Sequence, residues 1–335
     1  MLTEIVNKFK YLSSFLLSAA VLAVGFLPLP ATAQWKPQKG VEIVAMSGPG
    51  GANDVIARAI QRYLQQHKLV AVPVTVTNRP GAGGVLAWTY LNQHAGDGGF
   101  LSVSPINLIT EHIAGASPIT YTDVTPIAQL FNEYVAYSVR PESGLKSGGD
   151  LVQQLKGDPG SASFAVAAAL GGANHIATAL AMRTAGVDVR KMKFVVFNAG
   201  PQSTAAILGG HVYVAVTPVS GIAPHFQAGR LRVLAVTAPQ RLHGAFSAVP
   251  TLKEQGVDTV FSSFRGVIGP KGLSREQVEY WEDVLRKIVQ TDEWKQDLEK
   301  NYWEAGFMGS AEAMKYLKSQ YDQYRPVLAD LGLAK

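Results

Sequence analysis

Two glycine-rich turns hold the residues of this chain that are best placed for chemistry. The first turn has the sequence SGPGGAND and covers residues 47–54, and the second has GGANH at 171–175. Each turn lies between a strand-like apolar run and a helix-like run, which places unpaired backbone N–H groups at a helix N-terminus. Such an end carries about half a positive charge and binds a phosphate or a carboxylate. The turns therefore predict a site for an anion.

A nucleotide is the first candidate for this anion, and the spacing of the glycines argues against it. The dinucleotide fingerprint needs glycine at three positions of G-x-G-x-x-G, and Asn53 stands at the third position here. A P-loop needs Gly-Lys-Ser/Thr, and no such lysine follows. A further glycine run, NRPGAGG at 78–84, fails both tests. We expect no nucleotide and no other cofactor.

The sequence also lacks the arrangements that nucleophilic or metal catalysis requires. It contains no G-x-S-x-G elbow, no H-E-x-x-H motif and no cysteine, and its seven histidines stand apart without metal-ligand spacing. We therefore expect no catalytic residue and no bound metal.

Five polar residues lie near the turns or the strand ends, and all of them except Asp54 have two interpretations. Asp54 is interpreted as compensating the helix dipole. Asn53 and Asn174 either cap their helices or contact a ligand. His175 is a capped or surface residue, or a hydrogen-bond donor to an acidic ligand. Arg265 clamps a carboxylate or forms a structural ion pair.

Alternating strand-like and helix-like runs position the first turn. VEIVAM at 41–46 and VPVTVTN at 72–78 predict strands, and apolar residues at helical spacing over 54–64 predict a helix between them. A helix over 85–93 and the strand FLSVS at 100–104 follow. Strands separated by helices indicate a mainly parallel sheet.

The same order of elements returns later in the chain. GGANH at 171–175 corresponds to GGAND at 50–54 with an offset of 121 residues. Asn198 corresponds to Asn78 and Thr217 to Ser104, with offsets of 120 and 113. This internal repeat predicts two similar α/β lobes, each with a glycine turn at the carboxyl ends of its strands, where such sheets bind ligands.

The two termini differ from the repeat. Lys8 and Lys10 precede an apolar run and the small residues of Ala31–Ala33, the order of a secretory signal peptide. Pro28 and Pro30 shorten the apolar run below the roughly 20 residues that span a membrane. We expect residues 1–33 to be cleaved near Ala33, leaving a periplasmic chain that is not itself membrane-spanning and has no disulfides. At the other end, residues 274–277 predict a capping box followed by two amphipathic helices.

Charge gives only a weak indication of the ligand. The net charge of +5 falls to +4 without Lys8, Lys10 and Glu4, and the charged residues are scattered along the chain. A mild and dispersed excess suits an anionic small molecule and argues against nucleic acid as a partner.

With these residues in view, the chain resembles the substrate-binding receptors of tripartite tricarboxylate transporters, the Bug family. The resemblance covers essentially the whole mature chain in order, and each motif is weak when taken alone. Its motifs are PGGAND (49–54), NRPGAGG (78–84), AGDGGFLSVS (95–104), DVTPIAQL (123–130), GGANH (171–175), LGGHVYV (208–214), AGRLRVLAVT (228–237) and VPTLKEQG (249–256). The chain departs from the family pattern at Tyr213, at 264–266 and at 195–198. These departures lie near the expected cleft, so they affect the identity of the ligand more than the fold.

The resemblance implies a two-lobed type II periplasmic-binding-protein fold, in which each lobe is a mixed, mainly parallel sheet flanked by helices. Lobe 1 would be discontinuous, with residues 34–136 and 263–335, and lobe 2 would comprise residues 137–262. Together with the two-way interpretation of Arg265, the resemblance implies a set of ligand-binding residues. They are Ser47, Gly48, Gly50, Gly51, Asn53, Ser104, Asn107, Ala168, Gly171, Gly172, Asn174, His175, Asn198, Thr217 and Arg265.

The function that the resemblance implies is that of a monomeric receptor, which captures a small organic carboxylate and delivers it to a permease of two integral-membrane subunits. Two alternatives remain at this point. One is an exported α/β enzyme that acts on a carboxylate through Asp54, His175 or Arg265. The other is a sensor that reports its ligand to a membrane kinase.

Overall fold

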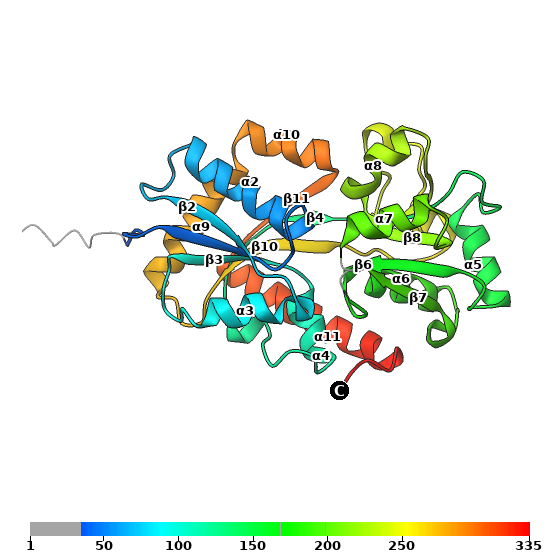
Figure 1. The fold of residues 1–335 in the computed structure, drawn as a ribbon, viewed down its shortest axis with the longest axis horizontal. Coiled ribbons are helices and arrows are strands. Elements are labelled where there is room, and N and C mark those ends of the chain that lie inside the picture. Colours follow the sequence, from blue (N-terminus) through cyan, green and yellow to red (C-terminus); the bar gives the residue numbers. More distant parts are fainter. Residues whose placement is uncertain (1–34, 168, 198) are drawn as a thin grey trace, which may run out of the picture. The chain divides into compact units, whose positions relative to one another are not determined.

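The structure, a computed structural model, describes residues 35–167, 169–197 and 199–335. The expected signal peptide, residues 1–33, lies outside the described residues, and so do Ala168 and Asn198. Two sheets flanked by helices make up the described chain, an α/β architecture with two lobes (Figure 1). The boundaries between the lobes stay a prediction.

The first sheet has six strands, and its parallel part lies at one side. In spatial order the strands are β2 (Val74–Asn78), β1 (Val41–Ala45), β3 (Phe100–Ser104), β10 (Ser263–Gly269), β4 (Thr125–Glu133) and β11 (Trp303–Gly309). Strand β1 pairs in parallel with β2 and β3, whereas β10 and β11 pair antiparallel with their neighbours.

The second sheet repeats this plan with five strands. In spatial order they are β7 (Lys193–Phe197), β6 (Ser163–Ala167), β8 (Val214–Pro218), β5 (Val135–Val139) and β9 (Arg232–Val236). Strand β6 pairs in parallel with β7 and β8, and β5 pairs antiparallel with β8 and β9. The order β7-β6-β8 therefore matches β2-β1-β3, which agrees with the internal repeat in the sequence.

Both sheets are mixed, and their antiparallel pairs are at least as extensive as the parallel ones. The antiparallel pairs arise from the strands that carry the chain from one sheet to the other. Strand β4 ends at Glu133 in the first sheet and β5 begins at Val135 in the second, so the chain changes sheet within two residues. The chain returns from β9 to β10, which enters the first sheet antiparallel to β3.

Helices follow the strands of each repeat. Those around the first sheet are α2 (Ala52–Gln66), α3 (Val85–Asn92), α4 (Asn107–Ile113), α9 (Arg275–Val289), α10 (Asp292–Asn301) and α11 (Ser310–Asp330). Those around the second sheet are α5 (Gly148–Gly157), α6 (Ala173–Thr184), α7 (Gly200–Leu208) and α8 (Val219–Gln227). The predicted capping box is confirmed at α9, where Ser274 Oγ accepts the Gln277 N–H and Gln277 Oε1 accepts the Ser274 N–H.

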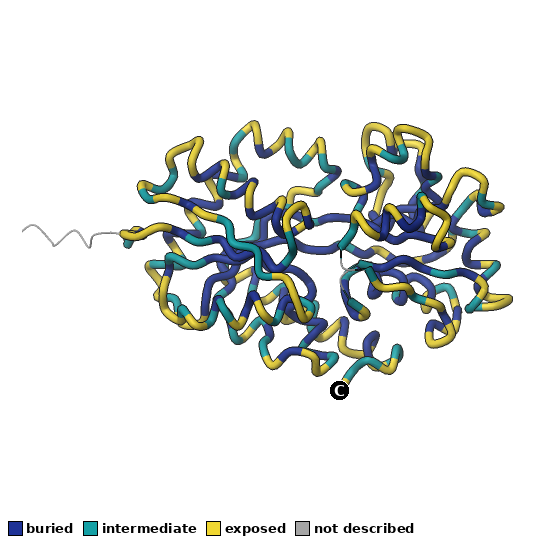
Figure 2. Tube along the Cα trace, viewed as in Figure 1, coloured by how far each residue is buried: buried dark blue, intermediate teal, exposed yellow. Residues whose placement is uncertain are grey.

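The central strands of each sheet form the interior of both lobes (Figure 2). Large aromatic side chains fill the space between strands and helices, among them Trp88, Trp281 and Phe164, each with no measurable exposure. Burial of such side chains supplies most of the favourable free energy of folding. This packing makes the strands a rigid support for the loops at their carboxyl ends. Among the described residues, no helix is long and apolar enough to cross a membrane.

Candidate functional site

Hydrogen bonds inside the first glycine turn fix its shape. The N–H of Gly50 donates to Asp54 Oδ2 at 2.8 Å, and the N–H of Asp54 donates to Ser47 Oγ at 3.1 Å. Gly50 has φ +76°, a left-handed conformation that favours glycine. The turn is thus held from within, at the start of α2.

Asn78, at the end of β2, ties the first turn to the neighbouring strand. Its Nδ2 donates to Ser47 O and to Asp54 Oδ1, both at 2.8 Å. Arg58 Nε also donates to Asp54 Oδ1, at 3.0 Å. Burial alone would raise the pKa of Asp54, but hydrogen bonds from Asn78, Gly50 and Arg58 more than offset it and hold this pKa below its usual value. Asp54 lies in the first turn of α2, as a dipole-compensating residue must, and also anchors the glycine turn.

The second glycine turn repeats this arrangement with a histidine in place of the aspartate. The N–H of Gly171 donates to His175 Nδ1 at 2.8 Å, and Gly171 has φ +86°. The His175 ring is 3 % exposed and meets the edge of Phe194, with ring centroids 4.3 Å apart.

Burial determines the charge of His175. Desolvation lowers its pKa to about 4, so the ring is neutral near pH 7. Because Nδ1 accepts the Gly171 N–H, the single ring proton of the neutral form is on Nε2. The Nε2–H group is therefore a neutral hydrogen-bond donor, and the burial of the ring excludes the interpretation of His175 as a surface residue.

Both turns leave backbone N–H groups unpaired. The helices begin after Gly51 and Gly172, and these N-cap glycines have no side chain to accept the N–H groups that follow. Among the described residues, the N–H groups of Ala52, Asn53, Ala173 and Asn174 have no acceptor. Neither asparagine acts as the cap, which excludes one of its two interpretations. These ends of α2 and α6 carry the partial positive charge that attracts an anion.

Polar side chains without a hydrogen-bond partner lie at a helix start or at strand ends in the two repeats. The buried atoms Asn53 Oδ1, Ser104 Oγ and Thr217 Oγ1 make no hydrogen bond among the described residues. Buried polar atoms of this kind are rare in folded proteins, because an unmade hydrogen bond costs about 1–3 kcal/mol. Each belongs to one of the two repeats, at a helix start or a strand end.

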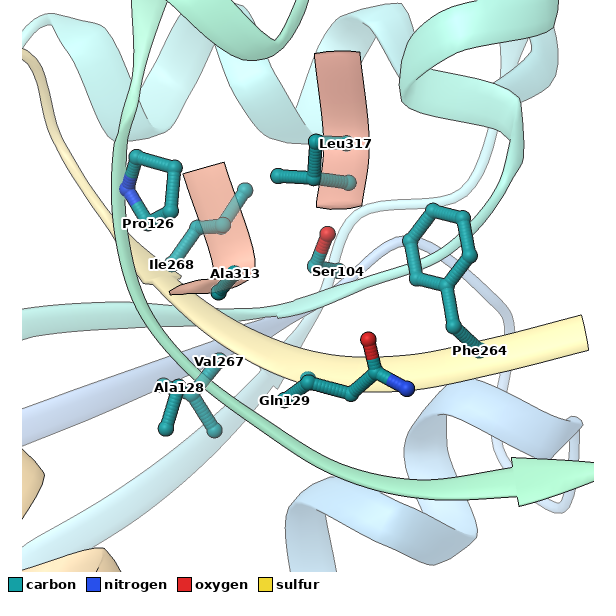
Figure 3. Close-up of a pocket in the computed structure, with 10 residues that line it drawn as sticks. Ser104, Pro126, Ala128, Gln129, Phe264, Val267, Ile268, Ala313 and Leu317 are labelled. Carbon is teal, nitrogen blue, oxygen red and sulfur yellow. The ribbon is translucent and has the colours of Figure 1, made fainter. Parts of the chain in front are cut away.

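Ser104 also lines a small cavity between β4, β10 and α11. Ser104, Phe264 and Leu317 lie around it (Figure 3), and its volume is about 10 Å³. A cavity of this size admits one water molecule at most. An organic acid therefore does not fit beside Ser104 from this side in the present conformation.

The structure gives Arg265 the role of a structural ion pair, the second of its two interpretations. Its Nη2 lies 2.9 Å from Glu133 Oε2, and both side chains are buried. Glu133 Oε1 also accepts hydrogen bonds from Ser220 Oγ at 2.8 Å and Trp303 Nε1 at 3.2 Å. The pair lies where β4 ends, so Arg265 stabilises the strands that link the two sheets.

The predicted site residues thus fall into four groups. Ser47, Gly48, Gly50, Gly51 and Asn53 form the first turn, and Gly171, Gly172, Asn174 and His175 form the second. Ser104, Asn107 and Thr217 lie at or just after strand ends, and Arg265 lies within β10. Ala168 and Asn198 are outside the described residues.

Sequence reasoning missed the structural role of Asn78 and missed Glu111 altogether. Glu111 is buried in α4, four residues after Asn107. That i, i+4 spacing in the sequence was the available signal. In the part of the chain that the structure describes, no group of three or more His, Cys, Asp or Glu residues is arranged to hold a metal ion.

The fold and its paired turns are those of a two-lobed solute-binding protein. The family model of the tripartite tricarboxylate transporter family receptor matches residues 56–333. The chain belongs to this family.

Curated relatives agree with this assignment. The chain is 27% identical over 325 residues to a protein of Cupriavidus necator named for the gbd 5′ region, with 95% of this chain and 96% of the relative covered. It is 29% identical over 256 residues to protein BugT of Bordetella pertussis, with 75% and 76% covered.

Solved structures show the same fold. A protein from R. palustris solved with adipate has a TM-score of 0.80 at 23% identity, with 89% of this chain and 99% of that chain covered. MatC from Rhodopseudomonas palustris, solved with bound malate, has a TM-score of 0.77 at 20% identity, with 87% and 99% covered.

Proposed function

We propose that this protein is a periplasmic receptor that binds one small organic carboxylate between its two lobes and delivers it to a membrane permease. The observation that carries this proposal is the pair of equivalent glycine turns, each with unpaired N–H groups at a helix start. Two such ends, one from each repeat, suit a ligand with negative charge.

The ligand contacts in this proposal come from both turns and from the strand ends beside them. A carboxylate oxygen accepts hydrogen bonds from the N–H groups at the start of α2 or α6. His175 Nε2 adds a neutral donor, and the unpaired oxygens of Ser104 and Thr217 supply hydroxyl groups. The proposed set further includes Ser47, Gly48, Gly50, Gly51, Asn53, Asn107, Ala168, Gly171, Gly172, Asn174 and Asn198, with Arg265 supporting the linking strands.

Ligands of similarly folded proteins support the choice of an organic acid. Adipate is bound to one of them and malate to another. Both molecules carry two carboxylates on a short carbon chain. The family description points to a transporter receptor, which supports delivery to a permease.

We propose binding rather than catalysis, because the candidate catalytic groups are engaged elsewhere. Asp54 accepts three hydrogen bonds or ion-pair contacts that hold its own turn, and Arg265 pairs with Glu133. His175 uses Nδ1 to accept the Gly171 N–H, which leaves no free basic nitrogen for proton abstraction.

A thermal-shift screen of the mature protein against organic acids, amino acids and nucleotides tests the proposal. A ligand present at 100 times its Kd stabilises the folded state by about 2.7 kcal/mol. The proposal predicts stabilisation by an organic acid and none by nucleotides. Mass spectrometry of the bound acid after long incubation separates receptor from enzyme, since a receptor returns the acid unchanged. Conversion of the acid would favour the enzyme alternative.

A further inference from the structure

A buried carboxyl group lies next to the proposed site and has no positively charged partner. Glu111, in α4, is 6 % exposed. Its one hydrogen bond to another described side chain comes from Asn107 Nδ2, which donates to Glu111 Oε1 at a long 3.4 Å. No salt bridge among the described residues includes Glu111.

The glycine run at 78–84 packs directly against this carboxyl group. A Cβ atom added to Gly83 would lie 2.5 Å from Glu111 Cδ and Oε1, so the backbone of the run is in contact with the carboxyl. The same run begins at Asn78, whose side chain holds the first glycine turn. Glu111 is therefore connected to the first turn through one short segment.

The arginine of the glycine run does not neutralise Glu111. Arg79, in the same glycine run, places its guanidinium over the ring of Tyr90, 3.4 Å from the centroid. Burial raises the pKa of Glu111, because the ionised carboxyl loses contact with water and gains only the Asn107 hydrogen bond. A positively charged group brought in by a ligand would offset this cost.

The orientation of Asn107 makes this corner rich in acceptors. Because Asn107 Nδ2 donates to Glu111, Asn107 Oδ1 is left as an acceptor, and Glu111 Oε2 is a second acceptor without a donor among the described residues. Two free acceptors suit an ammonium group and repel a second carboxylate. The Oδ1 atom of Asn107 is thus better suited to an amino group of the ligand than to its carboxylate.

We propose that Glu111 and Asn107 bind the amino group of an amino acid whose carboxylate lies at the starts of α2 and α6. This inference rests on the proposed receptor function and narrows the ligand to zwitterionic acids. A zwitterion satisfies both features of the site, since its carboxylate meets the helix starts and its ammonium group meets Glu111.

Matched ligand pairs that differ only in the amino group test the inference. Isothermal titration of the mature protein would compare L-glutamate with glutarate, L-aspartate with succinate, and 2-aminoadipate with adipate. We expect the amino acid of at least one pair to bind tenfold or more tightly than the matched plain acid. A hydrogen bond to a charged group accounts for an affinity ratio of this size. In Glu111→Gln this ratio falls to about one, because the neutral amide keeps the shape and loses the charge.

The control is Glu312→Gln, which makes the same chemical change at an exposed position in the first turn of α11. The Glu312→Gln protein must keep the wild-type ratio between the affinities for the amino acid and for the matched plain acid. The Glu111→Gln protein is also checked by its unfolding midpoint, which should equal or exceed that of the wild type, since a buried charge has been removed.

Two results would overturn the inference. If plain acids bind and the ratio is unchanged in Glu111→Gln, the receptor function stands and the role of Glu111 is wrong. If neither series binds and no organic acid stabilises the protein in the thermal-shift screen, the proposed function itself fails, and the inference fails with it.

Discussion

Asp54 and His175 occupy the same position in two glycine turns that lie 121 residues apart in the sequence. Asp54 Oδ2 accepts the N–H of Gly50, and His175 Nδ1 accepts the N–H of Gly171, both at 2.8 Å. One geometry is thus built with two different acceptors. The anionic acceptor is paired with Arg58, and the neutral one packs against Phe194. In both turns the acceptor holds the glycine while the N–H groups that follow stay free for a ligand.

Replacing the first acceptor should loosen the first turn. Asp54→Ala leaves the N–H of Gly50 and the amide of Asn78 without their acceptor, so we expect a loss of about 1–3 kcal/mol in the free energy of unfolding. Carboxylate affinity should fall as well. Urea denaturation and titration calorimetry measure the two effects. Asp283→Ala, at an exposed position of α9, is the control and should change neither quantity.

The buried His175 should make stability depend on pH. Its pKa is about 4 in the folded protein against 6.5 as the reference for the unfolded chain. Between these values the unfolded chain binds the proton and the folded protein does not, so stability is lost as pH falls from 6.5 to 4. The full loss is about 3 kcal/mol.

His175→Asn isolates this contribution, because the Asn side chain cannot take up a proton. The variant should show a flatter dependence of unfolding free energy on pH over that window than the wild type, measured by denaturation at a series of pH values. His211→Asn, at an exposed position, should keep the wild-type slope. Equal slopes in His175→Asn and the wild type would show that His175 takes up its proton equally well in the folded and unfolded chain.

Gly83 should be intolerant of a side chain for two separate reasons. Its φ of +63° strains any other residue, and an added Cβ would lie 2.5 Å from the Glu111 carboxyl. We expect Gly83→Ala to cost about 1–3 kcal/mol. Gly186→Ala, with φ +82° and open space around the added Cβ, measures the strain alone and should cost less. Adding Glu111→Ala to Gly83→Ala should recover the steric part, and the absence of any recovery would count against the packing described.

The ion pair between Arg265 and Glu133 should matter for folding. Arg265→Met leaves a buried carboxylate without its partner, which costs about 3–5 kcal/mol. The double variant Arg265→Met/Glu133→Leu should recover most of this loss, as followed by chemical denaturation. Arg275→Ala breaks an exposed pair with Glu279 and should cost far less, because water screens that pair. A double variant as unstable as the single one would show that Glu133 is not the partner that matters.

The parts of the site that the sequence predicted are local. The glycine turns around positions 50 and 171, the helix starts after them and the capping box at Ser274 all depend on residues within a few positions of each other. The internal repeat predicted the matching order of three strands in each sheet, because the same alternation of strands and helices folds in the same way twice.

The parts that the sequence did not predict depend on contacts between distant residues. Glu133 and Arg265 are 132 residues apart and meet only because β4 and β10 are neighbours in the sheet. The segment of α10 and β11 was also missed. Strand β11 is an edge strand that contains two glycines, and its residues lack the strict alternation of buried and exposed positions that predicts a strand.

The most direct test of the central claim is to follow the backbone amides of both glycine turns by NMR during titration with the organic acid or amino acid that binds best. A ligand held by both turns should shift the amide signals of Ala52 and Asn53 together with those of Ala173 and Asn174, in one saturable transition with one ligand per protein. Shifts confined to a single turn, or two transitions at different ligand concentrations, would contradict a shared site formed by both repeats.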